Sequence, residues 1–430
     1  MLLATLAFVF FPVPPPQQED PYRIPFEDEK SAFTGFDQAA LDAKMAEILP
    51  RLEKIRGWTF KAPVQAGVQS IEDFMRFAAQ SMEEEYGEGG FAGMTTSAIL
   101  LGLLPEDKDL GAMMNKMLEA SVGGYYDPKT RNFWIIAGFS QGPMADMIMS
   151  HELEHALDDQ RYPLDPLLAA TKGNSDQQFA VRSVVEGSAT SAMNLYLVEA
   201  IRSGWLPPGD LMSGDLISEQ LRALGDAPAS MLAGLLLPYV EGNGFLLRGG
   251  SILEGAMRPP APEDLERAFT APPLSSEQIF HPEKYWDPAL LDLPRLVSVP
   301  DRSAALGAGW TSVDEDTLGE LGCALLAVKR LPSPLELQFG AVSLRNPAAS
   351  GWGGDRYRTY RQEQGARVLH ARIEWDTEKD AKEFMEAMAV KEARARIPYL
   401  RILRRDGALV EMVCADAAGA EAASRLIGAR

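Results

Sequence analysis

Residues 151–155 read His-Glu-Leu-Glu-His, and this pentapeptide constrains the fold more than any other feature of the chain. Side chains four residues apart on an α-helix share one face, so a helix here would let His151 and His155 hold one metal ion between them. Glu152 lies beside them, where it can take a proton from a water molecule. The alternative is a pair of histidines packed on a core helix. We favour metal binding, because the chain has only four histidines and a chance match to the pattern is therefore rare.

A catalytic zinc site needs a third protein ligand and keeps a fourth position for water. Only His281 and His370 remain as further histidines, so we expect a carboxylate. Glu186 is the best candidate, because it lies in the middle of the next helical stretch among apolar residues, where an unpaired carboxylate is costly. The adjacent Gly187 lacks a side chain and lets two helices approach closely. The alternative for Glu186 is a solvent-facing helix glutamate.

Zinc bound by His151, His155 and Glu186 would lower the pKa of a bound water, and Glu152 would serve as the general base. Asp159 lies four residues beyond His155 on the same helix face, so we expect it to accept a hydrogen bond from an imidazole; the alternative is a solvated acid. An oxyanion formed during amide cleavage also needs a hydrogen-bond donor. The candidate donors lie in sequence that we interpret as loop, and each could instead be a buried aromatic or a histidine paired to a carbonyl: Tyr239, His281 and Tyr285.

The segment 151–160, His-Glu-Leu-Glu-His-Ala-Leu-Asp-Asp-Gln, together with Val-Glu-Gly-Ser-Ala-Thr at 185–190, resembles gluzincin-type zinc metallopeptidases. It is most similar to a poorly characterised bacterial group with His-Glu-x-x-His-Ala-Leu-x-Asp-Gln and Glu-Gly-x-Ala motifs. The resemblance is strongest over 120–195. It implies one catalytic Zn²⁺, a peptide or protein substrate, and a sheet edge at 131–136 along which an extended peptide can lie. One departure is Thr190, where well-studied gluzincins often have an acid.

The fold class that we expect is α+β: a zincin-like, mainly helical metallopeptidase domain with a small antiparallel sheet at 21–300, and a C-terminal α+β domain at 301–430. Apolar periodicity, caps and turn residues predict helices over 38–56 (bent or broken at Pro50), 71–86, 110–121, 143–160, 175–202, 210–225, 228–237, 262–268, 378–394 and 417–428. They predict strands at 63–68, on both sides of the turn at 127–130, and at 367–375, 399–404 and 408–413. We interpret the rest of 238–300 as irregular, and 351–357 as a tight turn.

The net charge of −20 repels phosphate backbones, so nucleic acid is not an expected partner. Residues 2–11 form an apolar run of signal-peptide length, and we interpret 1–20 as a possible leader of an exported, periplasmic or extracellular, protein. That run is too short to cross a bilayer, and no integral membrane span is expected elsewhere. Cys323 and Cys414 are too few for a disulfide framework. The sequence leaves the oligomeric state open.

The leading functional hypothesis is hydrolysis of peptide bonds by a zinc enzyme. A second is a catalytically silent, zincin-like binding module; Glu152 argues against it, since a site that only binds has no chemical need for a base. A third is a hydrolase acting on a non-peptide amide, which would share the site and differ in its pocket.

Overall fold

The computed structural model describes residues 3–6, 35–87, 89–205, 227–250, 252–255, 257–333, 336, 344–390 and 400–428. The apolar run beyond residue 6, the helix predicted at 210–225 and the end of the helix predicted to reach 394 lie outside the described residues. Within the described ranges, the structure is a mixed α+β fold with a four-stranded and a five-stranded sheet. None of the helices in these ranges has both the length and the apolar character needed to span a bilayer.

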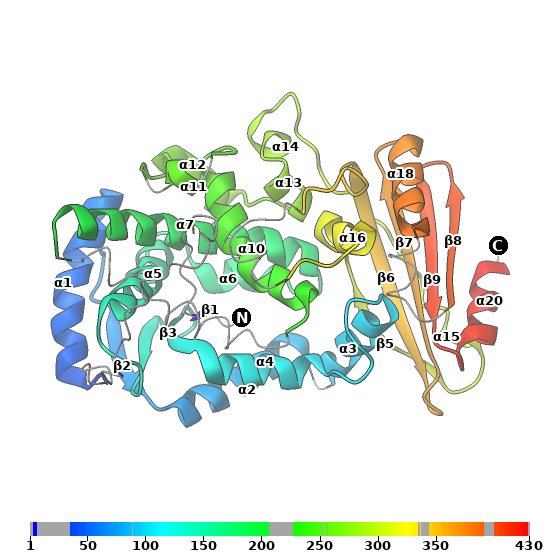
Figure 1. Ribbon diagram of the computed structural model, residues 1–430, viewed down its shortest axis with the longest axis horizontal. Coiled ribbons are helices and arrows are strands. Elements are labelled where there is room, and N and C mark those ends of the chain that lie inside the picture. The colour runs from blue at the N-terminus through cyan, green and yellow to red at the C-terminus, as the bar shows by residue number, and fades with distance from the viewer. Residues whose placement is uncertain are drawn as a thin grey trace, which may run out of the picture.

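The helical part occupies the left and centre of Figure 1. Its helices are α1 (Gln38–Arg56), α2 (Ile71–Tyr86), α3 (Gly90–Leu100), α4 (Leu110–Ser121), α5 (Pro143–Asp159), α6 (Leu164–Ala169), α7 (Ser175–Arg202), α10 (Ala229–Leu246), α11 (Ile252–Gly255), α12 (Pro262–Thr270), α13 (Ser276–Phe280) and α14 (Glu283–Trp286). The region interpreted as irregular is therefore partly helical, because α10 runs on through Pro238 to Leu246 and α13 and α14 follow, whereas 287–300 contain no helix or strand.

The predicted helix at 38–56 is α1, and it runs through Pro50 without the break that was one of the two predicted outcomes there. Asp37 caps the N-terminus by accepting a hydrogen bond from the Ala40 amide, and Gly57 ends the helix in the left-handed conformation. Proline removes only one backbone hydrogen bond, whereas a continuous helix buries the apolar side chains on both sides of it, including Ile48 and Leu52.

The four-stranded sheet has the order β1-β3-β4-β2, with β1 (Leu3–Leu6), β2 (Gln65–Gln69), β3 (Val122–Asp127) and β4 (Asn132–Ile136). The hairpin β3–β4 confirms the predicted turn at 127–130. β2 pairs with β4 in parallel, so the sheet is mixed and not antiparallel throughout. The expectation that 131–136 forms a sheet edge is wrong, because β4 has a neighbour on each side. Gly67 favours this pairing, since a Cβ there would lie 2.5 Å from the Trp134 ring that packs against it.

The five-stranded sheet is antiparallel, in the order β5-β6-β7-β9-β8, and stands at the right of Figure 1. Its elements are β5 (Trp310–Asp316), β6 (Trp352–Gln362), β7 (Arg367–Trp375), β8 (Leu400–Asp406) and β9 (Leu409–Ala415), with helices α15 (Ser303–Leu306), α16 (Gly319–Ala327), α18 (Glu378–Ala389) and α20 (Ala420–Gly428). The predicted strands β7, β8 and β9 and the helices α18 and α20 are confirmed. The interpretation of 351–357 as a turn is wrong beyond Gly351, where the long strand β6 begins.

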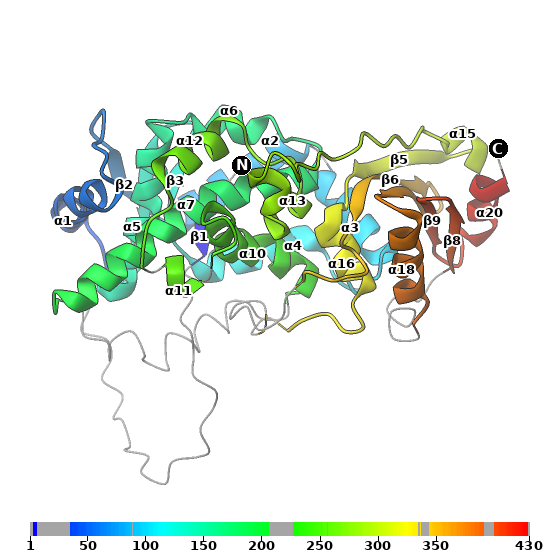
Figure 2. The same ribbon diagram turned by 90° about the horizontal axis from the view of Figure 1, so that it is seen from above.

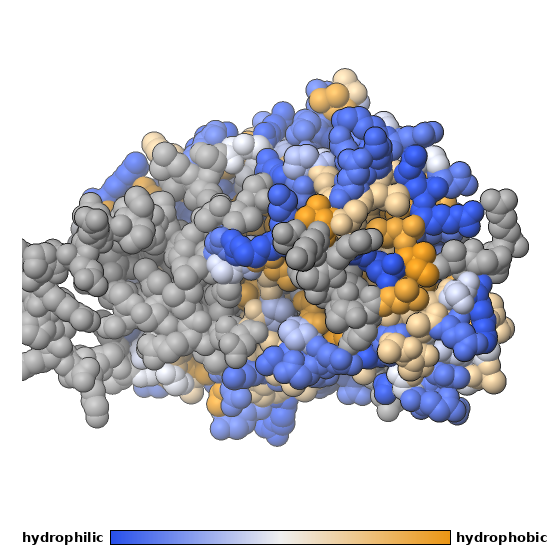
Figure 3. Space-filling model, turned by 45° about the vertical axis from the view of Figure 1, so that its right-hand side comes forward, coloured by the Kyte–Doolittle hydropathy of each residue, from blue (hydrophilic) through white to orange (hydrophobic). Residues whose placement is uncertain are grey.

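Helix α3 belongs to the first part of the sequence but packs on this sheet. Leu100 and Leu101 share a core with α16, α18 and the sheet residues Leu369 and Ile373. In both ribbon views α3 and α16 lie between the remaining helices of the helical part and the five-stranded sheet (Figures 1 and 2). A separate core on the opposite face of the sheet includes α15 and α20. The coloured surface in Figure 3 is mostly hydrophilic, with apolar residues exposed near the centre of that view.

Candidate metal centre

Helix α5 carries both histidines of the pentapeptide on one face. It starts as predicted at Gly142-Pro143, where proline occupies the first turn and loses no intrahelical hydrogen bond. The rings of His151 and His155 have centroids 4.7 Å apart and are nearly perpendicular, at 88°. Their exposures are 0% and 1%, so both imidazoles are removed from solvent and face the interior.

Helix α7 brings Glu186 to the two imidazoles. Its Oε2 lies 3.1 Å from His151 Nε2 and 3.5 Å from His155 Nε2. One ligand atom from each of the three residues lies within 4.8 Å of the others, which is the convergence that a metal ion requires. The predicted close approach at Gly187 is confirmed. A Cβ there would lie 2.3 Å from the backbone of Gly242, so α10 packs directly on α7 next to Glu186.

The electrostatics of this cluster suit a divalent cation. Burial lowers the pKa of His151, which favours the neutral imidazole that binds metals. Burial alone would raise the pKa of Glu186, but its interactions with His151 and His155 outweigh it and the pKa is lowered, so the carboxylate stays ionised. His155 Nε2 is buried and has no hydrogen-bond partner among the described residues. A cation shared by the three side chains would satisfy that nitrogen.

Glu152 is fully buried beside the cluster. Its Oε2 accepts a hydrogen bond of 2.7 Å from the backbone N–H of Tyr126 in β3. The strand therefore fixes the orientation of the carboxylate that we predict to act as a base. The Tyr126 hydroxyl in turn donates to Asp159 Oδ2 at 2.9 Å, so the same residue links these two acids of α5.

The predicted role of Asp159 is wrong, because its hydrogen-bond partner is not an imidazole. Besides Tyr126, the carboxylate accepts a hydrogen bond from the Leu164 amide and pairs with Arg131, and it contacts neither imidazole. The tight turn after α5 places the Leu164 N–H within 2.7 Å of Asp159 Oδ1, which draws this side chain toward the helix end. Among the described residues, Asp159 is therefore linked to Glu152 through Tyr126.

A buried ion cluster behind His155 is absent from the sequence-based predictions. Arg56 at the end of α1 lies 2.6 Å from Glu154 and 3.1 Å from Asp158, and all three side chains are at most 1% exposed. Burial raises the pKa of both carboxyls, and the positive charge of Arg56 opposes that shift. Arg56 also donates to Ser188 Oγ of α7. Glu154 does not share the helix face of the two histidines, so the sequence predicts a surface charge there; this prediction is wrong, because Glu154 is fully buried. Sequence alone gives no signal for this pairing with a residue about a hundred positions away.

Tyr239 is brought to the cluster, from helix α10 and not from the predicted loop. Its ring stacks on His151 at 5.5 Å between centroids, and its hydroxyl donates a hydrogen bond to Glu186. Burial raises the pKa of this phenol well above its ordinary value, and the charges of Glu186 and Glu152 add to the shift. Tyr239 therefore keeps its proton at neutral pH and remains a donor.

His281 and Tyr285 lie elsewhere, so the roles predicted for them are wrong. His281 Nε2 lies 3.0 Å from Glu320 of α16. Tyr285 donates to the Ala271 carbonyl at 2.7 Å and packs against Phe245 and Trp286. Tyr285 is the buried aromatic residue that the sequence left open as an alternative. His281 pairs with a buried carboxylate and not with the carbonyl that the sequence left open.

A second group of acids could geometrically hold a cation: Glu277, Asp292 and Asp376. The ammonium of Lys284 already contacts all three, at 2.6, 2.9 and 3.4 Å. This group is therefore an internal ion-pair network that links α13 to the end of β7.

Comparison with known proteins gives one match, to part of the chain. A family described as a domain of unknown function (DUF8575) matches residues 306–417, which run from α15 to just after β9. No curated protein and no solved structure matches. The cluster of His151, His155 and Glu186 lies outside the matched residues.

Proposed function

We propose that this chain is a zinc-dependent peptidase in which His151, His155 and Glu186 hold the metal and Glu152 is the general base. The observation that carries the proposal is the convergence of one oxygen and two imidazole nitrogens from two helices, with a second carboxylate on the adjacent position of the same helix. Three protein ligands leave a coordination position for water, which is typical of catalytic and not structural zinc sites.

In this mechanism a bound zinc ion would lower the pKa of water and polarise the scissile carbonyl. Glu152, held by the Tyr126 amide, accepts the proton of the attacking water and delivers it to the leaving amine. Tyr239 keeps its proton because burial raises the pKa of its phenol. When Glu186 binds the metal, the hydroxyl would turn from Glu186 and donate its one hydrogen bond to the oxyanion that forms beside His151. Tyr126 and Asp159 position Glu152 and do not themselves contact the reacting atoms.

One observation favours the silent binding module as a second candidate. His151, Glu152, His155 and Glu186 are each at most 1% exposed, so a substrate reaches them only when the chain around them moves. A metal that only stabilised the fold would need no such movement. A hydrolase of a non-peptide amide would use the same four residues, and no observation on the described residues favours it over a peptidase.

The test combines metal analysis with digestion of a peptide library. We expect about one zinc per chain, and cleavage that falls about 10²–10⁴-fold in Glu152→Gln while zinc content is kept. The matched control is Glu119→Gln, the same change at an exposed helical glutamate of α4, which should retain both. Zinc without cleavage in wild-type protein would favour the binding module. Cleavage of simple acyl amides but of no peptide would favour the third hypothesis.

A further inference from the structure

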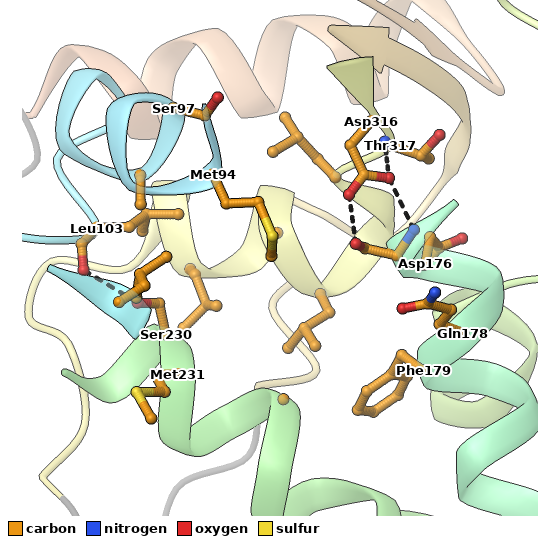
Figure 4. A pocket seen from close by; sticks show the side chains of 18 of the residues that line it. Met94, Ser97, Leu103, Asp176, Gln178, Phe179, Ser230, Met231, Asp316 and Thr317 are labelled. Carbon is orange, nitrogen blue, oxygen red and sulfur yellow. Dashed lines mark hydrogen bonds between the residues drawn. The ribbon is translucent and has the colours of Figure 1, made fainter. Parts of the chain in front are cut away.

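Buried acids line the junction where the helical part meets the five-stranded sheet. Asp176 is the second residue of α7, Asp355 lies in β6, and Asp316 ends β5. Their exposures are only 3%, 4% and 9%. Figure 4 shows Asp176 and Asp316 at the point where the start of α7 meets the end of β5. A carboxylate in such a position is costly unless its neighbours compensate the charge.

Asp316 is compensated by hydrogen-bond donors. It accepts a hydrogen bond from the amide of Ser175 at 2.7 Å and another from the hydroxyl of the same residue, drawn as dashed lines in Figure 4. The Thr317 amide is a third donor, at 2.7 Å. These donors favour the ionised form of Asp316 and tie the end of β5 to the first turn of α7.

Asp176 and Asp355, one from each part of the protein, meet at Gly319. The Gly319 amide donates to Asp355 Oδ1 at 2.9 Å. On the other side, a Cβ built on Gly319 would overlap Asp176 Oδ1. The two carboxyl oxygens are therefore at most about 7 Å apart. Only glycine leaves room for this approach, because a side chain at 319 would strike Asp176.

Hydrogen-bond donors are divided unevenly between the two acids. Asp176 Oδ1 accepts a hydrogen bond from the Ser276 amide at 2.9 Å. Asp355 accepts three, each at 2.9 Å, from the amides of Leu318 and Gly319 and from the indole of Trp352. Because N–H donors stabilise a carboxylate over the neutral acid, Asp355 is the better anion and Asp176 is the group that keeps a proton.

The electrostatics agree with this division. Burial raises the pKa of Asp176 to about 7, and the charges of Asp355 and Glu320 add to the shift. Burial also raises the pKa of Asp355, but only to about 6, because its hydrogen bonds oppose the shift. Asp176 therefore ionises after Asp355, close to neutral pH.

No lysine, arginine or histidine in the described ranges forms an ion pair with either acid. The charged groups on the surrounding elements pair with one another instead: Arg356 with Glu315 at 3.0 Å, Lys284 with Glu277 at 2.6 Å, and His281 with Glu320 at 3.0 Å. The other titratable neighbours are the acids Asp314 and Asp316 and the Cys323 thiol, whose pKa burial raises. None of these neighbours supplies a positive charge when Asp176 ionises.

We propose that Asp176 is a pH-sensitive contact between the helical part and the five-stranded sheet. While its carboxyl group is protonated, it packs beside the ionised Asp355 across Gly319, and the start of α7 stays fixed to the sheet. When it ionises, two like charges without a cation lie side by side, and the contact loosens. The proposal does not depend on the peptidase function. It gives the region matched by DUF8575 a role, because Asp355 and Gly319 belong to that region.

The size of the effect follows from the two states of the junction. In an open junction Asp176 is solvated and titrates near its ordinary pKa of 3.8, whereas in the closed junction it titrates near 7. Between these values the equilibrium constant for closing falls about tenfold per pH unit, and above 7 it levels off. Opening should therefore become at least tenfold more frequent between about pH 5 and about pH 8.

Hydrogen exchange of the full-length protein, followed by mass spectrometry, measures this opening. The reporters are backbone amides that donate to the junction acids: Ser175, Ser276 and Gly319. After correction for the intrinsic effect of pH on exchange, their protection should fall at least tenfold from about pH 5 to about pH 8. Peptides from β9, which pairs with β7 and β8 inside the sheet, should keep their protection and serve as the internal reference.

Asp176→Asn mimics the protonated acid and should keep the protection of the three amides constant over this pH range. Asp107→Asn is the matched control, since Asp107 is exposed, and should behave like wild type. Glu320→Gln removes a like charge near Asp176 and should make the fall smaller, which tests the electrostatics even if Asp176→Asn does not fold. Protection that does not change with pH in wild type, or that falls equally in Asp176→Asn or in Glu320→Gln, would overturn the proposal. No cleavage is measured, so these outcomes are independent of the proposed peptidase activity.

Discussion

The buried cluster of Arg56, Glu154 and Asp158 makes a strong prediction about stability. Arg56 lies within 3.1 Å of each carboxylate, and no side chain of the three is more than 1% exposed. Arg56→Met keeps the length and apolar stem of the side chain but removes the charge. It leaves two carboxyl groups in the interior, one turn or less from His155, with their main cation gone.

Removal of one partner from a buried ion pair costs about 3–5 kcal/mol, because the remaining charge is left uncompensated in a medium of low dielectric constant. Arg56 neutralises two acids and also donates to Ser188, so we expect the upper part of that range. The stacking of its guanidinium over Trp58, at 4.5 Å from the ring, is lost as well. The triple change Arg56→Met, Glu154→Gln, Asp158→Asn removes all three charges and should restore more than half of the lost stability.

Urea unfolding followed by circular dichroism at pH 7 measures both effects, with the midpoint and slope compared between variants. Arg76→Met is the matched control, because the Arg76 side chain is 79% exposed and should contribute less than about 1 kcal/mol. The reasoning fails if Arg56→Met lowers the free energy of unfolding no more than Arg76→Met does. It also fails if the triple variant is as unstable as the single one, since the unpaired charges would then not be the cause.

Three further predictions concern pH, metal binding and catalysis. Burial raises the pKa of the Asp176 carboxyl to about 7. The contribution of this group to stability is therefore present below pH 3.8 and is lost as pH rises through 7. Asp176→Asn should increase the free energy of unfolding by at most about 4 kcal/mol at pH 8 and by little at pH 4. Thermal melts at the two pH values check this against the exposed Asp107→Asn, and an equal effect at both would refute it. Glu186→Ala should weaken zinc binding at least 100-fold in competition with a chelator, and chelation should lower the melting temperature of wild-type protein; unchanged affinity would show that another donor holds the metal. Tyr239→Phe should lower kcat about 10–10³-fold with zinc content unchanged, whereas a loss confined to KM would contradict an oxyanion role.

The predictable part of the site is the part encoded by local spacing. His151 and His155 share a helix face by the geometry of any α-helix, and Glu186 was identifiable as a carboxylate in an apolar helical stretch. Their convergence within 4.8 Å agrees with both expectations. Gly187 signalled the close helix contact for the same local reason, namely that no side chain blocks it.

The unpredicted part depends on contacts between distant segments. The richness of 238–300 in Pro and Gly predicts a loop at Tyr239, yet tight packing of α10 on α7 keeps the helix continuous through Pro238. Arg56 pairs with acids about a hundred residues away, so Glu154 was assigned to the surface. The parallel partner of β4 was missed because hydrophobic alternation identifies a strand but not its neighbours.

Because α3 packs on the five-stranded sheet, the two parts of the protein cannot be separated by cutting the chain between them. Leu100 and Leu101, encoded two hundred residues before the sheet, complete the core on which Leu369 and Ile373 pack. A fragment that begins at residue 301 would expose that apolar face to water and would aggregate or fail to fold. A useful truncation of the C-terminal region would therefore have to carry α3 with it, for example fused through a linker.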